Sequence, residues 1–213
     1  MRETCRGLSS RCVGYSEKKM KTNEVTREIE RDIPFYESSG GDVTFSGGGP
    51  LLQIDFLKTL LLESKKHNLH ITIDTARNVP WHVFKEILPY VDLFLYDIKS
   101  IDNERHRIWT GIGNINILNN LTRLSVNDAV IRVRIPVIAG FNDTINEMVK
   151  IADTLWEIGK ADSIELLPYH RLGEGKYKSF GMKYKYKGIP PKESLIDEFM
   201  KIFREKGFKV EEN

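Results

Sequence analysis

Five short apolar runs in this sequence contain, or end in, polar and small residues that can bind a ligand. In chain order these residues are Ser46, Gly47, Gly48, Gly49 and Pro50; Asp74 and Thr75; Asp97 and Lys99; Arg134; and Pro168, Tyr169 and His170. The glycine loop lets backbone amides and carbonyls contact a ligand, and the N-terminus of the helix after it favours a negatively charged end. The spacing matches neither a Walker loop nor a Rossmann loop. The loop therefore predicts a site for a carboxylate or a phosphate.

The other residues of this set supply hydrogen bonds and hard oxygen ligands. Asp97, Lys99 and His170 can bind hydroxyls and ring nitrogens of a nucleoside, whereas Asp74 and Thr75 offer oxygens suited to a cation. Taken singly, each has an ordinary explanation, such as a tight turn, a turn cap or a solvated ion pair. Five such signals at five successive strands predict one shared cup, because parallel strands present their carboxyl ends on the same face.

Two hydrophobic periodicities alternate along the chain and predict the elements that hold these residues. Strand-like runs lie at 42–46, 70–74, 92–98, 129–137, 163–169 and 208–212. Helix-like segments, with apolar residues three or four apart, lie at 25–36, 57–61, 83–88, 117–124, 145–156 and 195–203. Strands separated by helices indicate a parallel α/β fold, either a barrel or a doubly wound sheet. The helix at about 22–37 opens this repeat with no strand before it, so the first strand of the pattern is missing.

Composition limits the class of protein. The 213 residues are 40% apolar, which suffices for one sizeable core. The 32 basic and 30 acidic residues give a formal net charge of +2, so no global field indicates a nucleic-acid or membrane binder. No run approaches the roughly 18 apolar residues of a membrane span, and the first residues lack the apolar stretch of a signal peptide. We expect a cytoplasmic protein.

Several blocks of the sequence together resemble one family. These are "SGGDVTFSGGGPLLQIDFL", "TIDT", "DLFLYDIKSIDNERHRIWTGIGN", "RIPVIAGFND" and "IELLPYHRLGEGKYKSFG". In this order and spacing they resemble the activating enzymes of glycyl radical enzymes, such as pyruvate formate-lyase activating enzyme, within the radical S-adenosylmethionine (SAM) superfamily. The resemblance covers nearly all of the chain from Thr22 to the C-terminus. We therefore expect a radical SAM barrel domain at 22–213, preceded at 1–21 by the tail of a cluster-bearing, ferredoxin-like segment.

The resemblance implies a partial (β/α)6 TIM-like barrel whose open face holds S-adenosylmethionine against a [4Fe-4S] cluster. By similarity, the loop from Ser46 to Pro50 would hold the methionine amino group. Asp97 and Lys99 would face the ribose and carboxylate, and Arg134 would lie near the carboxylate. The adenosine side would be lined by Val137 to Gly140 and by His170. Some relatives hold a monovalent cation near the carboxylate, which here would involve Asp74, Thr75 and Asp97.

The sequence departs from the family pattern in its cysteines. The family's CxxxCxxC motif, whose three thiolates hold three irons of the cluster, does not occur, because the only cysteines are Cys5 and Cys12. We therefore do not expect a cluster in this chain alone. These two thiols are either remnants of an additional cluster site or ordinary free cysteines. A second departure is Gly49, where the family motif GGEP carries glutamate.

Two functions of different classes follow. The first is an activating enzyme that installs a glycyl radical on a partner such as pyruvate formate-lyase, here lacking its cluster segment through truncation, a misplaced start or a split gene. Its partners would be a glycyl radical enzyme and an electron donor such as flavodoxin or ferredoxin. The second is a non-catalytic barrel remnant that binds a small molecule or docks to a glycyl radical enzyme. A sugar-phosphate or nucleotide-binding enzyme outside this superfamily is a third, more distant alternative.

Overall fold

The computed structural model describes residues 20–47, 49–76, 78–171, 174–179, 181–184, 186 and 188–212. Cys5, Cys12 and Gly48 lie outside the described residues, as does most of the expected segment 1–21. Within the described part of the chain, no helix is long and apolar enough to cross a membrane.

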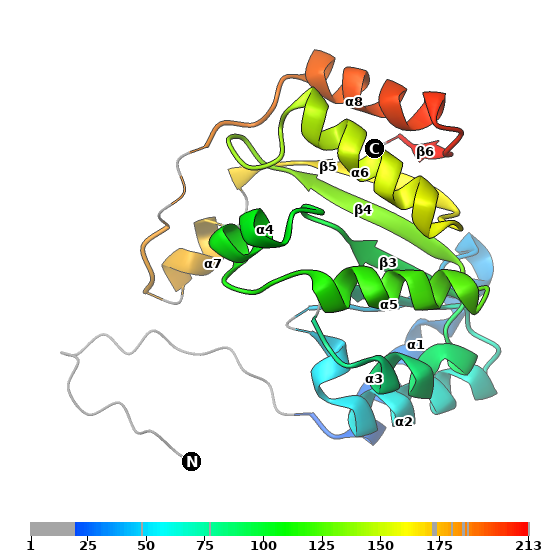
Figure 1. The fold of residues 1–213 in the computed structure, drawn as a ribbon. Coiled ribbons are helices and arrows are strands. Elements are labelled where there is room, and N and C mark those ends of the chain that lie inside the picture. Colours follow the sequence, from blue (N-terminus) through cyan, green and yellow to red (C-terminus); the bar gives the residue numbers. More distant parts are fainter. Residues whose placement is uncertain are drawn as a thin grey trace.

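A single parallel sheet of six strands forms the centre of the fold (Figure 1). The strands are β1 (Val43–Phe45), β2 (Ile71–Thr75), β3 (Leu93–Asp97), β4 (Ile131–Val137), β5 (Ser163–Pro168) and β6 (Val210–Glu211). Each strand pairs with the next one in the sequence, so the sheet order never reverses as it would in a doubly wound fold. Among the described residues, β1 pairs with β2 alone and β6 with β5 alone. The prediction of a partial, open barrel is confirmed, and all six predicted strands are present.

Helices connect the strands, and most of them cover the outside of the sheet (Figure 1). They are α1 (Thr22–Ser39), α2 (Ile54–Lys66), α3 (Trp81–Ile87), α4 (Asn103–Thr110), α5 (Ile115–Val126), α6 (Ile145–Ile158), α7 (Glu174–Ser179) and α8 (Glu193–Glu205), with short 3-10 turns at Pro50–Leu52 and Leu88–Tyr90. The six helices predicted from apolar spacing are all observed. The first of them, α1, lies mainly against α2.

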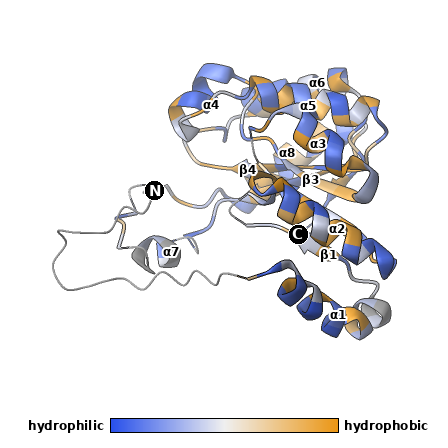
Figure 2. Cartoon of the chain, turned by 90° about the horizontal axis from the view of Figure 1, so that it is seen from below, coloured by the Kyte–Doolittle hydropathy of each residue, from blue (hydrophilic) through white to orange (hydrophobic). Residues whose placement is uncertain are grey.

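The strands alternate between a core face and an interior face, and β4 shows this most clearly. Ile131, Val133, Ile135 and Val137 are wholly buried, while Arg132 and Arg134 between them are partly exposed. The buried residues belong to one hydrophobic core with the inner faces of the helices. Figure 2 shows the hydrophobic strands enclosed by helices in which hydrophobic and hydrophilic bands alternate. This alternation directs the other side chains, Arg134 among them, into the barrel interior.

Aspartates just before alternate strands accept hydrogen bonds from the backbone of neighbouring strands, at the end of the sheet opposite the predicted cup. Asp92 accepts a hydrogen bond from the Ile71 amide at 2.7 Å, and Asp162 accepts one from the Ile131 amide at 2.7 Å. Asp92 also pairs with Lys65. Burial acts to raise the pKa of Asp92, but the hydrogen bonds from Lys65 and the Ile71 amide outweigh it and hold the pKa below its usual value.

Replacing this carboxylate is expected to cost stability only where it is ionised. Asp92→Asn should lower the free energy of unfolding by about 1 kcal/mol at neutral pH, because the partly exposed pair with Lys65 is lost. A depressed carboxyl pKa stabilises the fold above the unfolded-state pKa, and this contribution disappears as the pH falls. Urea titrations at neutral pH and at about pH 3 should therefore show the deficit shrinking in acid. If the loss of unfolding free energy in Asp92→Asn were as large in acid as at neutral pH, this account would be contradicted. The control variant is Asp128→Asn, which changes an exposed aspartate.

Candidate functional site

An ion-pair network fills the interior of the barrel below the carboxyl ends of the strands. Arg134 on β4 lies at its centre, with Nη1 3.1 Å from Oδ1 of Asp74 on β2 and Nε 3.5 Å from Oε2 of Glu165 on β5. Ser46, which follows β1, donates a hydrogen bond of 2.8 Å to Oδ2 of Asp74. Residues that are far apart in sequence therefore meet in one network, as the strand-end argument predicted.

Asp97, at the end of β3, is a partly buried acid with one buried oxygen atom. Its Oδ2 lies 3.2 Å from Nζ of Lys99, whereas its buried Oδ1 has no hydrogen-bond partner among the described residues. Burial raises the pKa of Asp97, although the positive charges of Lys99 and Arg134 act in the opposite direction. An unsatisfied acceptor of this kind costs free energy in the protein alone, and a ligand that donates a hydrogen bond recovers it.

A cavity of about 370 Å³ lies above this network, and we call it the polar cup. Its lining residues are Gly47, Gly49, Asp74, Thr75, Ala76, Asp97, Lys99, His106, Thr110 and Ile112. Six of these were predicted as ligand-binding residues from the sequence. Arg134 does not line the cup, but it holds Asp74, which does.

The glycine loop forms one wall of the polar cup. Gly47 has φ +105° and Gly49 has φ +109°, and the Gly49 amide donates a hydrogen bond of 2.7 Å to the Gly47 carbonyl. A Cβ atom built on Gly47 would meet nothing within 4 Å, so the loop exposes its backbone to open space. Glutamate at position 49 would be strained in this conformation. The backbone conformation thus explains why position 49 is glycine in this chain, where the family motif GGEP carries glutamate.

Besides Ser46 and Arg134, three further predicted residues lie outside the cup lining. The Val137 side chain is wholly buried in the core, so only the backbone around it can face a ligand. His170 is exposed just beyond β5. Pro50 borders a separate hollow beside β1, together with Ser46 and residues of α1 and α2. Their assignment to a cofactor stays a prediction.

Helix α4 contributes a wall that sequence reasoning missed. His106 is 4% exposed, and its Nδ1 donates a hydrogen bond of 2.7 Å to the Ile112 carbonyl. Thr110 and Ile112 continue this wall around the cup. Asp102 begins the helix by accepting a hydrogen bond from the Arg105 amide. The sequence signal that could have indicated this wall is its position, because this polar segment directly follows β3.

The donor set of the polar cup fits S-adenosylmethionine. The exposed glycine backbone suits an amino-acid end, and the Asp97 carboxylate that lines the cup suits a hydroxyl or ammonium donor. The prediction of a monovalent cation at Asp74, Thr75 and Asp97 stays untested. In this structure Asp74 contacts Arg134 and Ser46. A [4Fe-4S] cluster open to a cofactor needs three thiolates, and the two cysteines of this sequence do not supply them. Both cysteines lie outside the described residues, so the expectation that this chain alone holds no cluster stays a prediction.

Comparisons with known proteins agree with this geometry. The family model of the radical SAM superfamily matches residues 10–155. The choline trimethylamine-lyase activating enzyme of Oleidesulfovibrio alaskensis is 40% identical over 171 residues, which are 79% of this chain and 55% of that protein. The 4-hydroxyphenylacetate decarboxylase activating enzyme of Clostridioides difficile is 40% identical over 191 residues, or 87% and 59%. The chain thus spans somewhat more than half the length of these curated relatives.

A solved structure shares the fold. The crystal structure of a domain of pyruvate-formate lyase-activating enzyme from Bacteroides vulgatus superposes with a TM-score of 0.69 at 28% identity, covering 80% of this chain and 98% of that domain. The family match covers more than half of the chain, and the open parallel barrel and the glycine-lined cup are consistent with it. This chain therefore belongs to the radical SAM superfamily and is similar to activating enzymes of glycyl radical enzymes.

Proposed function

We propose that this chain is the S-adenosylmethionine-binding barrel of an activating enzyme that installs a glycyl radical on a partner enzyme. The observation that carries the proposal is the polar cup, in which the Asp97 carboxylate lines the same cavity as the exposed backbone of Gly47. The names of the relatives support the reaction class. In this proposal residues 22–213 form the barrel domain, 1–21 are the tail of a cluster-bearing segment, and the enzyme works in the cytoplasm.

Each part of the cup has one task in this proposal. The glycine loop receives the methionine end of the cofactor, because a side chain there would occupy the space it needs. Asp97 accepts hydrogen bonds from the ribose, and Lys99 compensates the cofactor's carboxylate. Arg134 holds Asp74 in place from below. When bound, S-adenosylmethionine supplies hydrogen-atom abstraction after one-electron reduction.

The cluster that reduces the cofactor in this superfamily needs ligands from elsewhere. Two cysteines cannot supply three thiolates, so we propose that polypeptide not contained in this sequence provides them. Flavodoxin or ferredoxin would be the electron donor. The same cysteine count favours a second candidate, a barrel that binds the cofactor or docks to a glycyl radical enzyme without catalysis.

Direct binding to glycyl radical enzymes tests the proposal. The purified chain should bind at least one member of a panel consisting of choline trimethylamine-lyase, 4-hydroxyphenylacetate decarboxylase and pyruvate formate-lyase, measured by biolayer interferometry. Binding to none of them above the level of an unrelated α/β enzyme would contradict the proposed role. Binding without any effect on radical formation, once a cluster-bearing segment is supplied, would favour the non-catalytic candidate.

A further inference from the structure

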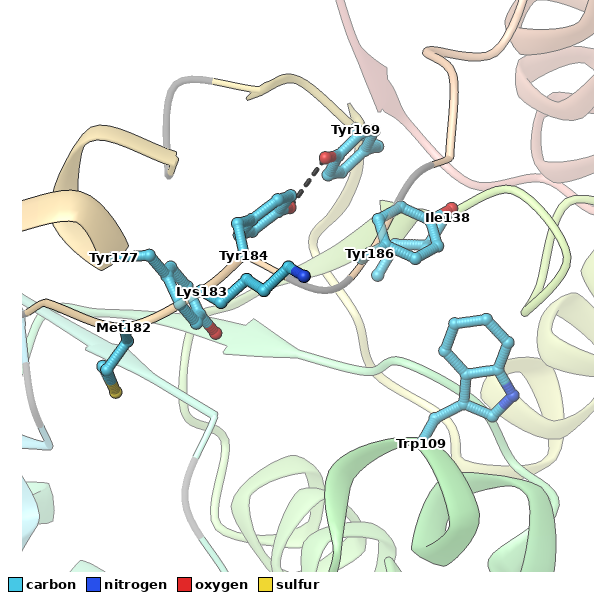
Figure 3. A pocket seen from close by; sticks show the side chains of 8 residues that line it. All are labelled: Trp109, Ile138, Tyr169, Tyr177, Met182, Lys183, Tyr184 and Tyr186. Carbon is cyan, nitrogen blue, oxygen red and sulfur yellow. Dashed lines mark hydrogen bonds between the residues drawn. The ribbon is translucent and has the colours of Figure 1, made fainter.

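A second and larger cavity lies beside the polar cup, and we call it the tyrosine pocket. Its volume is about 810 Å³, within the usual range for ligand sites. The lining residues are Trp109, Ile138, Tyr169, Tyr177, Met182, Lys183, Tyr184 and Tyr186. Figure 3 shows these side chains converging from α4, from the ends of β4 and β5, from α7 and from the segment 182–186.

The rings of the pocket are held in place by contacts with one another. The Tyr186 ring stands perpendicular to that of Tyr169, with 5.0 Å between their centres, and its hydroxyl donates a hydrogen bond of 2.7 Å to the Ala139 carbonyl. The hydroxyls of Tyr169 and Tyr184 are 2.6 Å apart (Figure 3), and this hydrogen bond raises the pKa of Tyr184 to about 12. The hydroxyls of Tyr169, Tyr184 and Tyr186 are thus engaged in hydrogen bonds, which leaves their ring faces as apolar contact surface.

Several apolar side chains in and beside the pocket are exposed. Tyr177 is 42% exposed and Met182 54%. Trp109 lines the pocket at 43% exposure, and Ile108 and Ile112, close to it in sequence, are exposed by 78% and 48%. A small molecule in the pocket would leave Ile108 and Ile112 uncovered. Exposed apolar side chains next to a pocket are typical of a protein interface with an anchor residue.

The part of the sequence that supplies most of the pocket lining is basic. The sequence from 173 to 194 contains six lysines and only two glutamates, and among the described residues Lys183 lines the pocket. Such a local excess of one sign attracts a partner segment of the opposite sign and repels a basic one. Charge complementarity therefore indicates an acidic occupant.

The tyrosine pocket and the polar cup share one helix wall. Trp109 lines the tyrosine pocket, and the next residue, Thr110, lines the polar cup together with His106. An extended segment anchored in the pocket would therefore continue directly past the opening of the cup.

Resting on the function proposed above, we propose that the tyrosine pocket anchors an apolar side chain from an acidic, extended segment of the partner enzyme. The pocket would set where the reacting segment enters the cup. It would also select partners by the charge around their anchor residue.

Binding of short fluorescent peptides tests the anchor site directly, and the measurement needs neither cofactor nor cluster. The probe is a glycine- and serine-rich peptide with one central phenylalanine and flanking glutamates. Two comparison peptides replace the phenylalanine by serine, or the glutamates by lysines. Fluorescence anisotropy should show the acidic phenylalanine peptide binding at least about tenfold more tightly than either comparison peptide, and its affinity should fall as salt is added.

Charge reversal in the protein sharpens the test. Lys183→Glu should weaken binding of the acidic peptide and strengthen that of the lysine peptide, whereas Lys85→Glu on the exposed face of α3 should change neither. Equal binding of all three peptides, or equal effects of both variants, would overturn the inference. A chain that binds a glycyl radical enzyme but none of these peptides would leave the proposed function intact and refute only the anchor site.

Discussion

The 213-residue chain alone is expected to form no 5′-deoxyadenosine from S-adenosylmethionine, even after anaerobic treatment with iron, sulfide and a strong reductant. The reason is a ligand count. A cluster with one open iron site needs three thiolates, and Cys5 and Cys12 are the only cysteines in the sequence. Cofactor binding can persist under these conditions, because the polar cup is built from other residues.

The measurement is 5′-deoxyadenosine formed per chain, determined by chromatography with mass detection. A Cys5→Ala/Cys12→Ala variant is the matched control and should behave like the unmodified chain. Several turnovers by the unmodified chain that vanish in the double variant would refute the ligand count. They would mean that the two thiols build a cluster with a further ligand.

Asp97→Ala is expected to weaken S-adenosylmethionine binding by about 1–3 kcal/mol, or roughly 5- to 150-fold in the dissociation constant. The substitution removes the carboxylate that lines the cup, whose Oδ1 has no partner among the residues that the structure describes, and it removes the ion pair with Lys99. His170→Ala should have a smaller effect, because His170 is exposed and does not line the cup. Isothermal titration calorimetry of the two variants against the unmodified chain gives both numbers. Equal affinities for all three proteins would place the cofactor site elsewhere.

Stability measurements separate lost binding from lost folding in this variant. Because burial raises the pKa of Asp97, ionising this carboxyl works against the folded state. The folded chain should lose stability as the pH rises from the usual carboxyl pKa through the raised one. The Asp97→Ala variant lacks this pH-dependent loss of stability. If the variant is as stable as the unmodified chain at neutral pH but binds S-adenosylmethionine more weakly, the weaker binding reflects the lost carboxylate and not unfolding.

The sequence was sufficient for the parts of the fold that follow a repeating pattern. Alternation over 129–137 predicted β4, and its arginines point inward because strand side chains alternate between faces. Apolar spacing predicted six helices. The strand-end rule brought Gly47, Asp74 and Asp97 into one cavity, because parallel strands end on the same side.

The parts that the sequence did not predict depend on tertiary packing. Helix α4 has no continuous apolar face, and its exposed Ile108 and Trp109 break the usual pattern, so neither the helix nor the role of His106 was recognised. The tyrosine pocket is assembled from five separate segments, and no local pattern shows that Tyr169 and Tyr186 meet. For His170, family resemblance indicated a binding role, but side-chain exposure could not be read from the sequence.

Titration of the unmodified chain with S-adenosylmethionine tests the central claim most directly, since every proposed role depends on the polar cup binding this cofactor. We predict saturable binding at one site, tighter than that of adenosine or methionine alone, because the glycine loop and Asp97 hold opposite ends of a single molecule. The affinity should be modest without a cluster iron. No saturable binding at millimolar cofactor, or binding no tighter than that of adenosine alone, would contradict the account.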